Sequence, residues 1–206
     1  MDRIAVIDFE TTGLSPALGD RATEVAIVLV EGGQVVARFQ SLMNAGVRIP
    51  SFIESLTGIS NAMVAAAPPA SEVMAQASRF VGEVPMVAHN ASFDRRFWTA
   101  ELARLGLPVA AAPFACTMLL SRRLYPEAPS HKLGTLAALH RLPAAGRAHR
   151  ALADAEVAAS LLTRIQADLC QRFDLPDAPH PLLLKLQACQ RHALAGAVKK
   201  HREQGP

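Results

Sequence analysis

The sequence predicts an α/β fold in which a mixed β-sheet is flanked by helices. Three β-rich runs come first in the chain, and shorter strands then alternate with helical segments. Strands joined by short turns favour antiparallel pairing, whereas strands separated by helices favour parallel pairing, so this order implies both kinds. Half of the 206 residues are hydrophobic and 19% are charged, which supports a sizeable core and excludes a disordered or collagen-like chain.

The first three strands are marked by runs of apolar and β-branched residues. Residues 4–7 (Ile-Ala-Val-Ile) form an apolar run typical of a buried strand, which then enters polar residues. The runs 22–30 and 35–42 are joined by Glu31-Gly32-Gly33-Gln34, a hairpin signal. These three runs therefore predict the antiparallel part of the sheet.

Helices and short strands follow one another along the rest of the chain. In order, we expect a helical or irregular stretch at 51–66, a helix at 71–81, a short strand at 84–88, a helix at 92–105, a short strand at 114–118 running into a helix that ends at 124, and helices at 133–140 and 151–169. Pro85 argues that the strand at 84–88 either lies at an edge of the sheet or begins at this proline.

Residues 1–170 are predicted to form one domain, and residues 171–206 a Pro-broken, basic helical tail. The first part carries 15 Lys and Arg against 15 Asp and Glu, whereas the tail carries 6 against 3, so the net charge of +3 comes from the tail. Residues 182–200 are expected to form one helix with a weak apolar stripe. Such a helix could pack back on the domain or dock on a partner protein.

Several signals predict a protein of the cytoplasm with no membrane partner. No apolar run approaches the roughly 18 residues of a membrane span, and the run at 4–9 is too short for a secretory signal. The three cysteines lack CxxC pairing and so indicate neither a disulfide framework nor a zinc site.

Two carboxylates lie at the end of the first predicted strand. Asp8 and Glu10 are two residues apart, so both side chains leave the same face of the strand. Two like charges beside a core are unfavourable unless a counter-charge is bound, although a strand that simply enters solvent would show the same pair. Thr11-Thr12-Gly13 follow, and their hydroxyls and permissive backbone suit contact with a phosphate or sugar.

Two further carboxylates and a histidine complete a set of candidate functional groups. Asp94 and Asp154 lie near the starts of predicted helices, each on the inward apolar stripe, and His149 lies five residues before Asp154. Oxygen donors without cysteine favour Mg²⁺ or Mn²⁺ over zinc. Four carboxylates can hold two such ions, and a metal pair suits in-line displacement at phosphorus, with the histidine as general base. These residues predict a metal-dependent phosphodiester or phosphate hydrolase.

Three motifs resemble those of the DEDDh group of 3′–5′ exonucleases, relatives of the epsilon proofreading subunit of bacterial DNA polymerase III. They are Asp8-Phe9-Glu10-Thr11-Thr12-Gly13, Asn90-Ala91-Ser92-Phe93-Asp94 and His149-Arg150-Ala151-Leu152-Ala153-Asp154, and the resemblance covers residues 3–169. It implies a ribonuclease-H-like fold and an exonuclease domain at 1–170. It also implies that nucleoside 5′-monophosphates are released from DNA 3′ ends, single-stranded DNA above all, in proofreading or repair.

The resemblance also implies roles for individual residues. Asp8, Glu10 and Asp154 would hold the first of two Mg²⁺ or Mn²⁺ ions, Asp8 would bridge to the second with help from Asp94, and His149 would be the base. The implied contacts to the 3′-terminal nucleotide come from Thr11, Thr12, Gly13, Leu14, Leu56, His89, Asn90 and Phe93. Candidates for phosphate contacts are Arg95, Arg96, Arg122, Arg123, Lys132, Arg147 and Arg150.

Two other functions remain open at this point. The same chemistry would serve an RNA 3′-end trimming exonuclease, because the sequence shows no residue that reads a 2′-hydroxyl. A non-catalytic binding module on the same fold is disfavoured by the complete carboxylate set and His149. A DNA polymerase subunit is a candidate partner, although the tail carries no clear Gln-rich clamp-binding peptide.

Overall fold

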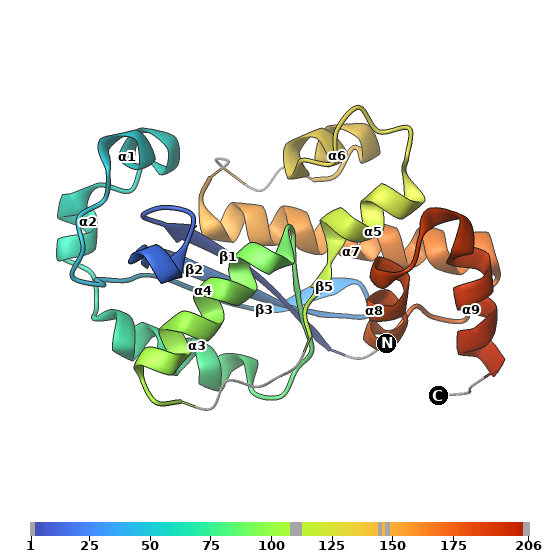
Figure 1. Ribbon diagram of the computed structural model, residues 1–206, viewed down its shortest axis with the longest axis horizontal. Coiled ribbons are helices and arrows are strands. Elements are labelled where there is room, and N and C mark those ends of the chain that lie inside the picture. Colours follow the sequence, from blue (N-terminus) through green and yellow to red (C-terminus); the bar gives the residue numbers. More distant parts are fainter. Residues whose placement is uncertain (1–2, 108–112, 144–145, 147–148, 204–206) are drawn as a thin grey trace.

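The computed structural model describes residues 3–107, 113–143, 146 and 149–203, and its centre is one five-stranded sheet (Figure 1). The strand order is β3-β2-β1-β4-β5. The strands are β1 (Ile4–Thr11), β2 (Ala22–Glu31), β3 (Gln34–Leu42), β4 (Met86–Ala88) and β5 (Ala115–Cys116). β1, β2 and β3 pair antiparallel, whereas β4 is parallel to both β1 and β5. The predicted mixed sheet is confirmed.

Helices cover both faces of this sheet (Figure 1). The α-helices are α1 (Ser51–Thr57), α2 (Asn61–Ala65), α3 (Ala70–Val81), α4 (Ala91–Arg104), α5 (Thr117–Leu124), α6 (Leu133–His140), α7 (Ala151–Phe173), α8 (His180–Ala188) and α9 (Leu194–Glu203). α7 packs on one face against β1 and β2, whereas α3 and α4 pack on the other. Alternate residues of β1 divide between the two cores, with Val6 in the α7 core and Ile7 in the α3–α4 core, as a period-two strand requires.

Some element boundaries differ from the prediction. β4 starts one residue after Pro85, whose carbonyl accepts a hydrogen bond from Ala5 N–H at 2.9 Å, so this proline marks a strand start inside the sheet and not an edge. The last strand has only two residues, because Thr117 already begins α5. α7 continues past the predicted end at 169 to Phe173, so the predicted domain boundary at 170 falls within this helix.

The expectation of one helix over 182–200 is wrong. Extended backbone at Cys189 and Gln190 separates α8 from a short 3-10 turn (Arg191–Ala193) and α9. This break folds α9 back beside α8, so that Leu194 and Val198 join Leu186 in the same buried core as α7. A straight helix would carry its last turns away from that core, because each residue adds about 1.5 Å to its length.

The tail is also bonded to the sheet. The Gln187 side chain accepts the Cys116 N–H at 2.6 Å and donates to the Phe114 carbonyl at 3.0 Å, which satisfies backbone groups beside β5. A ring nitrogen of buried His180 lies 3.0 Å from the carbonyl oxygen of Met86. Within the described part of the chain, none of the helices has the length and apolar character needed to cross a membrane.

Candidate active site

The end of β1 carries Asp8 and Glu10 on the face of the sheet that α7 covers. They continue the alternation of Ile4 and Val6, whereas the intervening Phe9 is buried in the opposite core. The pairing of β1 with β2 shifts register between Glu10 and Thr11, so the regular ladder ends at the second carboxylate. The strand pattern therefore delivers both side chains to the end of the sheet, where they are partly buried.

Asp94 reaches the same end of the sheet from α4. It lies in the first turn of that helix and is only 2% exposed. Its Oδ1 atom accepts a hydrogen bond from the Phe9 N–H at 3.2 Å, which joins the first and second motifs directly. Asn90 precedes the helix with φ at +68°, a left-handed conformation that asparagine tolerates better than most residues.

Asp154 and His149 complete the cluster from the start of α7. The Asp154 Oδ2 atom accepts the backbone N–H of His149 at 3.0 Å, and His149 adopts a left-handed conformation with φ at +59°. One ligand atom from each of Glu10, His149 and Asp154 lies within 4.8 Å of the other two. Three segments that are far apart in the sequence thus place carboxylates and an imidazole in one small region.

Burial raises the pKa of every carboxyl in this cluster, and the charges of neighbouring carboxylates add to the effect at Asp8 and Glu10. Burial, followed by the charges of Asp94, Glu10 and Asp154, holds the pKa of Asp8 well above its ordinary value. Burial and neighbouring carboxylates raise the pKa of Glu10 to about 8, and burial raises that of Asp94 to about 8 despite hydrogen bonds to backbone N–H groups. The pKa of Asp154 is raised as well, again mainly by burial.

This electrostatic arrangement fits a divalent cation. Several oxygen donors with elevated pKa values converge at one place, and a hard cation would replace the protons and remove the repulsion. Arg150, whose charge lowers the pKa of Glu10, is already committed to another carboxylate, that of Glu24. The donor chemistry therefore suits Mg²⁺ or Mn²⁺ at Asp8, Glu10, Asp94 and Asp154.

Sequence reasoning missed Glu24, which is fully buried on β2 directly opposite Glu10. Its carboxylate accepts two hydrogen bonds from the Arg150 guanidinium, at 2.8 and 3.1 Å, and one from the Ala151 N–H at the start of α7. Together with a hydrogen bond from the Gln40 side chain and the charge of Arg150, these hydrogen bonds outweigh the effect of burial and lower the pKa of Glu24. A charged residue inside an otherwise apolar strand was the signal that could have revealed it. Arg150, a predicted phosphate contact, anchors α7 to the sheet through this carboxylate.

The segment after β1 forms a tight loop beside the carboxylates. The Thr11 hydroxyl donates to the Gly13 carbonyl at 2.6 Å, and both Thr11 and Thr12 are buried. A Cβ atom on Gly13 would lie 2.4 Å from the Asp20 side chain, so this close approach requires glycine. Leu14 is 77% exposed and Leu56, on α1, is 47% exposed, which leaves both apolar side chains free to contact a ligand.

The other predicted nucleotide contacts, His89, Asn90 and Phe93, differ in how much of each side chain is free to contact a ligand. His89 and Asn90 line an open cavity of about 820 Å³ together with Lys132, His149 and Asp154. Both ring nitrogens of His89 are within hydrogen-bond distance of protein oxygens, Thr117 Oγ1 at 2.9 Å and the His131 carbonyl at 3.0 Å, and burial lowers its pKa to about 4. His89 can therefore offer a ligand its ring face more readily than its polar atoms. Phe93 packs on Phe97 at a ring distance of 5.0 Å.

Among the remaining candidates for phosphate contacts that the structure describes, three are exposed and one is bonded to backbone carbonyls. Arg95 and Arg96 are exposed on α4, and Arg122 is exposed on α5. Arg123 donates to the carbonyls of Leu119 and Cys189, so it is engaged in linking α5 to the tail. Arg147, another of the predicted phosphate contacts, lies outside the described residues.

Comparison with known proteins identifies relatives of this chain. The chain is 36% identical over 193 residues to the 3′-5′ exonuclease DinG of Bacillus subtilis, covering 94% of this chain and 20% of that protein. It is also 36% identical over 167 residues to the PolC-type DNA polymerase III of Halalkalibacterium halodurans, covering 81% of this chain and 12% of that protein. The chain thus spans a fifth or less of the length of these relatives.

Solved structures share the fold. Exonuclease X in complex with 5′ overhanging duplex DNA is 28% identical, with a TM-score of 0.70, and the match covers 90% of this chain and 99% of that one. Escherichia coli exonuclease I in complex with a dT13 oligonucleotide has a TM-score of 0.73 at 18% identity, covering 84% of this chain and 43% of that one, and shows likeness of fold alone. These matches confirm the expected ribonuclease-H-like layer of a mixed sheet and flanking helices. The family model described as "Exonuclease" matches residues 5–162, and the chain belongs to this exonuclease family.

Proposed function

We propose that the chain is a metal-dependent 3′–5′ exonuclease that releases nucleoside 5′-monophosphates from DNA 3′ ends. The observation that carries the proposal is the convergence of Asp8, Glu10, Asp94, Asp154 and His149 from three distant segments. Support for direction and substrate comes from the names of the relatives, a 3′-5′ exonuclease and DNA polymerases, and from a DNA-bound structural neighbour. A role in proofreading or repair is part of the same proposal.

The carboxylates would hold two divalent ions, Mg²⁺ or Mn²⁺. Asp8, Glu10 and Asp154 would hold the first, and Asp8 with Asp94 the second. Bound ions of this kind neutralise charge on a phosphate and lower the pKa of water. The raised pKa values of Asp8, Glu10, Asp94 and Asp154 support this assignment, because a bound cation would stabilise the charged carboxylates that burial disfavours.

His149 would accept the proton of the attacking water. Its side chain is exposed at the edge of the cavity, and its backbone is held by the hydrogen bond to Asp154. The same proximity to Glu10 and Asp154 would also let the imidazole act as a metal ligand. The two roles predict different results for His149→Ala: a base loses rate and retains metal affinity, whereas a ligand loses both.

The 3′-terminal nucleotide would occupy the space between the loop after β1 and the cavity beside α6. Buried Thr11 and Thr12, with the half-buried Gly13, form the wall next to the carboxylates, and exposed Leu14 and Leu56 are available to pack on a base. Asn90 lines the cavity from the start of α4. A phosphodiester next to that nucleotide would then face the carboxylate cluster.

A digestion experiment on end-labelled oligonucleotides tests the proposal. With Mg²⁺ or Mn²⁺, 5′-labelled single-stranded DNA should shorten one nucleotide at a time, and 3′-labelled DNA should release labelled mononucleotide at once. Mismatched duplex DNA and RNA are parallel substrates, and a circular single strand is the control for endonuclease activity. Cleavage of the circle, or activity that survives complete chelation, would refute the proposal. A strong preference for RNA would instead favour 3′-end trimming of RNA.

A further inference from the structure

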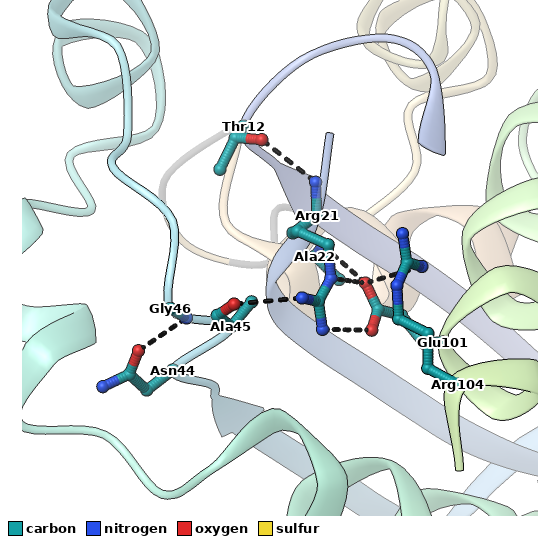
Figure 2. A network of polar contacts seen from close by, with 8 residues as sticks. All are labelled: Thr12, Arg21, Ala22, Asn44, Ala45, Gly46, Glu101 and Arg104. Carbon is teal, nitrogen blue, oxygen red and sulfur yellow. Dashed lines mark hydrogen bonds and ion pairs between the residues drawn. The ribbon is translucent and has the colours of Figure 1, made fainter. Parts of the chain in front are cut away.

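A second buried carboxylate lies on α4, away from the cluster. Glu101 is 2% exposed and follows Asp94 by seven residues, so the two share the inner face of the helix. A buried carboxylate that carries its charge is stabilised by a cationic partner, and Arg21 supplies one (Figure 2). Arg21 Nε lies 2.8 Å from Glu101 Oε1, and Arg21 Nη2 lies 2.8 Å from Glu101 Oε2. This two-point geometry fixes both the distance and the orientation of the two side chains.

The pair also joins the strand segments around it. The third guanidinium nitrogen of Arg21, Nη1, donates to the Ala45 carbonyl at 3.0 Å, in the segment that leads from β3 toward α1. Glu101 Oε1 additionally accepts the Ala22 N–H at 3.3 Å, and Arg104 lies 3.9 Å from the same oxygen. Figure 2 shows the start of β2, the segment after β3 and α4 meeting at this one ion pair.

The backbone of Arg21 closes the loop that follows β1. Thr12 N–H donates to the Arg21 carbonyl at 2.9 Å, and Arg21 N–H donates to the Thr12 hydroxyl at 3.0 Å. Within the loop, Asp20 accepts the Ser15 N–H at 2.8 Å. The Arg21 side chain thus holds α4 while its backbone holds Thr12, so a shift of this residue would shift the loop relative to Asp94.

We propose that the Arg21–Glu101 pair positions the Thr11–Leu14 loop relative to Asp94 and so sets where the terminal nucleotide rests. This inference depends on the proposed function, because it assigns the loop to nucleotide binding. The pair does not itself touch the reacting atoms. Its effect is to hold two walls of the site, one from β1 and one from α4, at a constant separation.

A positioning role and a merely stabilising role of this ion pair predict different results when the pair is replaced by apolar side chains. Buried ion pairs can often be replaced by apolar side chains of similar volume without loss of stability, because burial removes two charges from water. Such a replacement in this protein would fill the space but would lose the directional bonds to Glu101 and the Ala45 carbonyl. A stabilising role would therefore survive the apolar replacement, whereas a positioning role would not.

The experiment compares two double variants of the full chain. Arg21→Met with Glu101→Met removes the pair, and Arg3→Met with Glu31→Met is the matched control. The control removes an exposed Arg–Glu pair, with contacts at 2.8 and 3.0 Å, that joins residue 3, beside β1, to the end of β2 remote from the loop. Four readouts are needed: the melting temperature, Mn²⁺ affinity, affinity for dTMP in the presence of Mn²⁺, and kcat/KM on single-stranded DNA.

Positioning predicts a specific combination of results. The Arg21/Glu101 variant should bind Mn²⁺ within about twofold of wild type, bind dTMP about tenfold more weakly and lose about 10- to 100-fold in kcat/KM, since small misplacements of a substrate are costly. The control should match wild type in all four readouts. Wild-type dTMP affinity and kcat/KM in a folded Arg21/Glu101 variant would overturn the inference.

Arg21→Lys keeps the inference testable if the double variant does not fold. Lysine preserves the charge opposite Glu101 but loses the two-point contact and the bond to Ala45, so dTMP affinity should fall while the fold is retained. Wild-type dTMP affinity in this variant would also overturn the inference. Absence of dTMP binding and of exonuclease activity in the wild-type protein would instead refute the proposed function.

Discussion

Replacing Asp94 by Asn should stabilise the protein in the absence of metal, although the residue belongs to the proposed catalytic cluster. Burial raises the pKa of Asp94 to about 8, so the folded protein holds a proton that the unfolded chain releases near the ordinary value of 3.8. The stability associated with this group is complete below pH 3.8 and is lost as the pH rises toward 8. Asparagine is neutral at every pH and can still accept the Phe9 N–H through its amide oxygen.

The size of the effect follows from the two pKa values. Above pH 3.8 the unfolded chain has released this proton and the folded state keeps it. The free energy of unfolding therefore falls by about 1.36 kcal/mol for each pH unit, which amounts to roughly 4 kcal/mol at pH 7. Asp8 titrates together with Asp94, so the protons belong to the cluster as a whole and a gain of roughly 2–4 kcal/mol is expected from Asn. For a chain of this length, 2 kcal/mol corresponds to a rise of about 4–8 °C in Tm.

Thermal unfolding followed by circular dichroism in EDTA provides the assay. The Tm of the wild-type protein should fall from pH 5 to pH 8, and Asp94→Asn should reduce this slope and melt higher at pH 8. Mg²⁺ or Mn²⁺ should raise the Tm of wild type more than that of the variant. Glu83→Gln, at an exposed carboxylate, is the control and should leave the slope unchanged. A lower Tm for Asp94→Asn at pH 8, or a wild-type Tm that is independent of pH, would refute the reasoning.

Three further outcomes are expected. His149→Ala should lose roughly 10²-fold in kcat with Mn²⁺ affinity retained, and a wild-type kcat would exclude it as the base. Glu24→Gln should lower both the Tm and activity, because it weakens the charged bonds to Arg150 that anchor α7; wild-type values of both would contradict the anchoring role. Truncation after Leu169 should lower the Tm markedly, since Leu182, Leu186 and Val198 are buried in the main core, and an unchanged Tm would favour a docking role for the tail.

Much of the fold and of the carboxylate cluster could be predicted from local pattern. Period-two alternation in β1 placed Asp8 and Glu10 on one face, and helical periodicity placed Asp94 and Asp154 on inward stripes. These properties depend on residues only a few positions apart. The order of strands and helices then limited how the sheet could be assembled, which is why the mixed sheet was predictable.

Contacts between residues far apart in the sequence could not be predicted from local patterns. The bonds from Arg150 to Glu24 span 126 residues, and those from Arg21 to Glu101 span 80, so no local period relates the partners. The break between α8 and α9 is likewise decided by the core that Leu194 and Val198 enter. Sequence by itself determined which residue types lie at the end of β1 and at the starts of α4 and α7. Only the tertiary structure decided which charges neutralise one another there, because a buried charge is satisfied by whichever partner the fold brings within bonding distance.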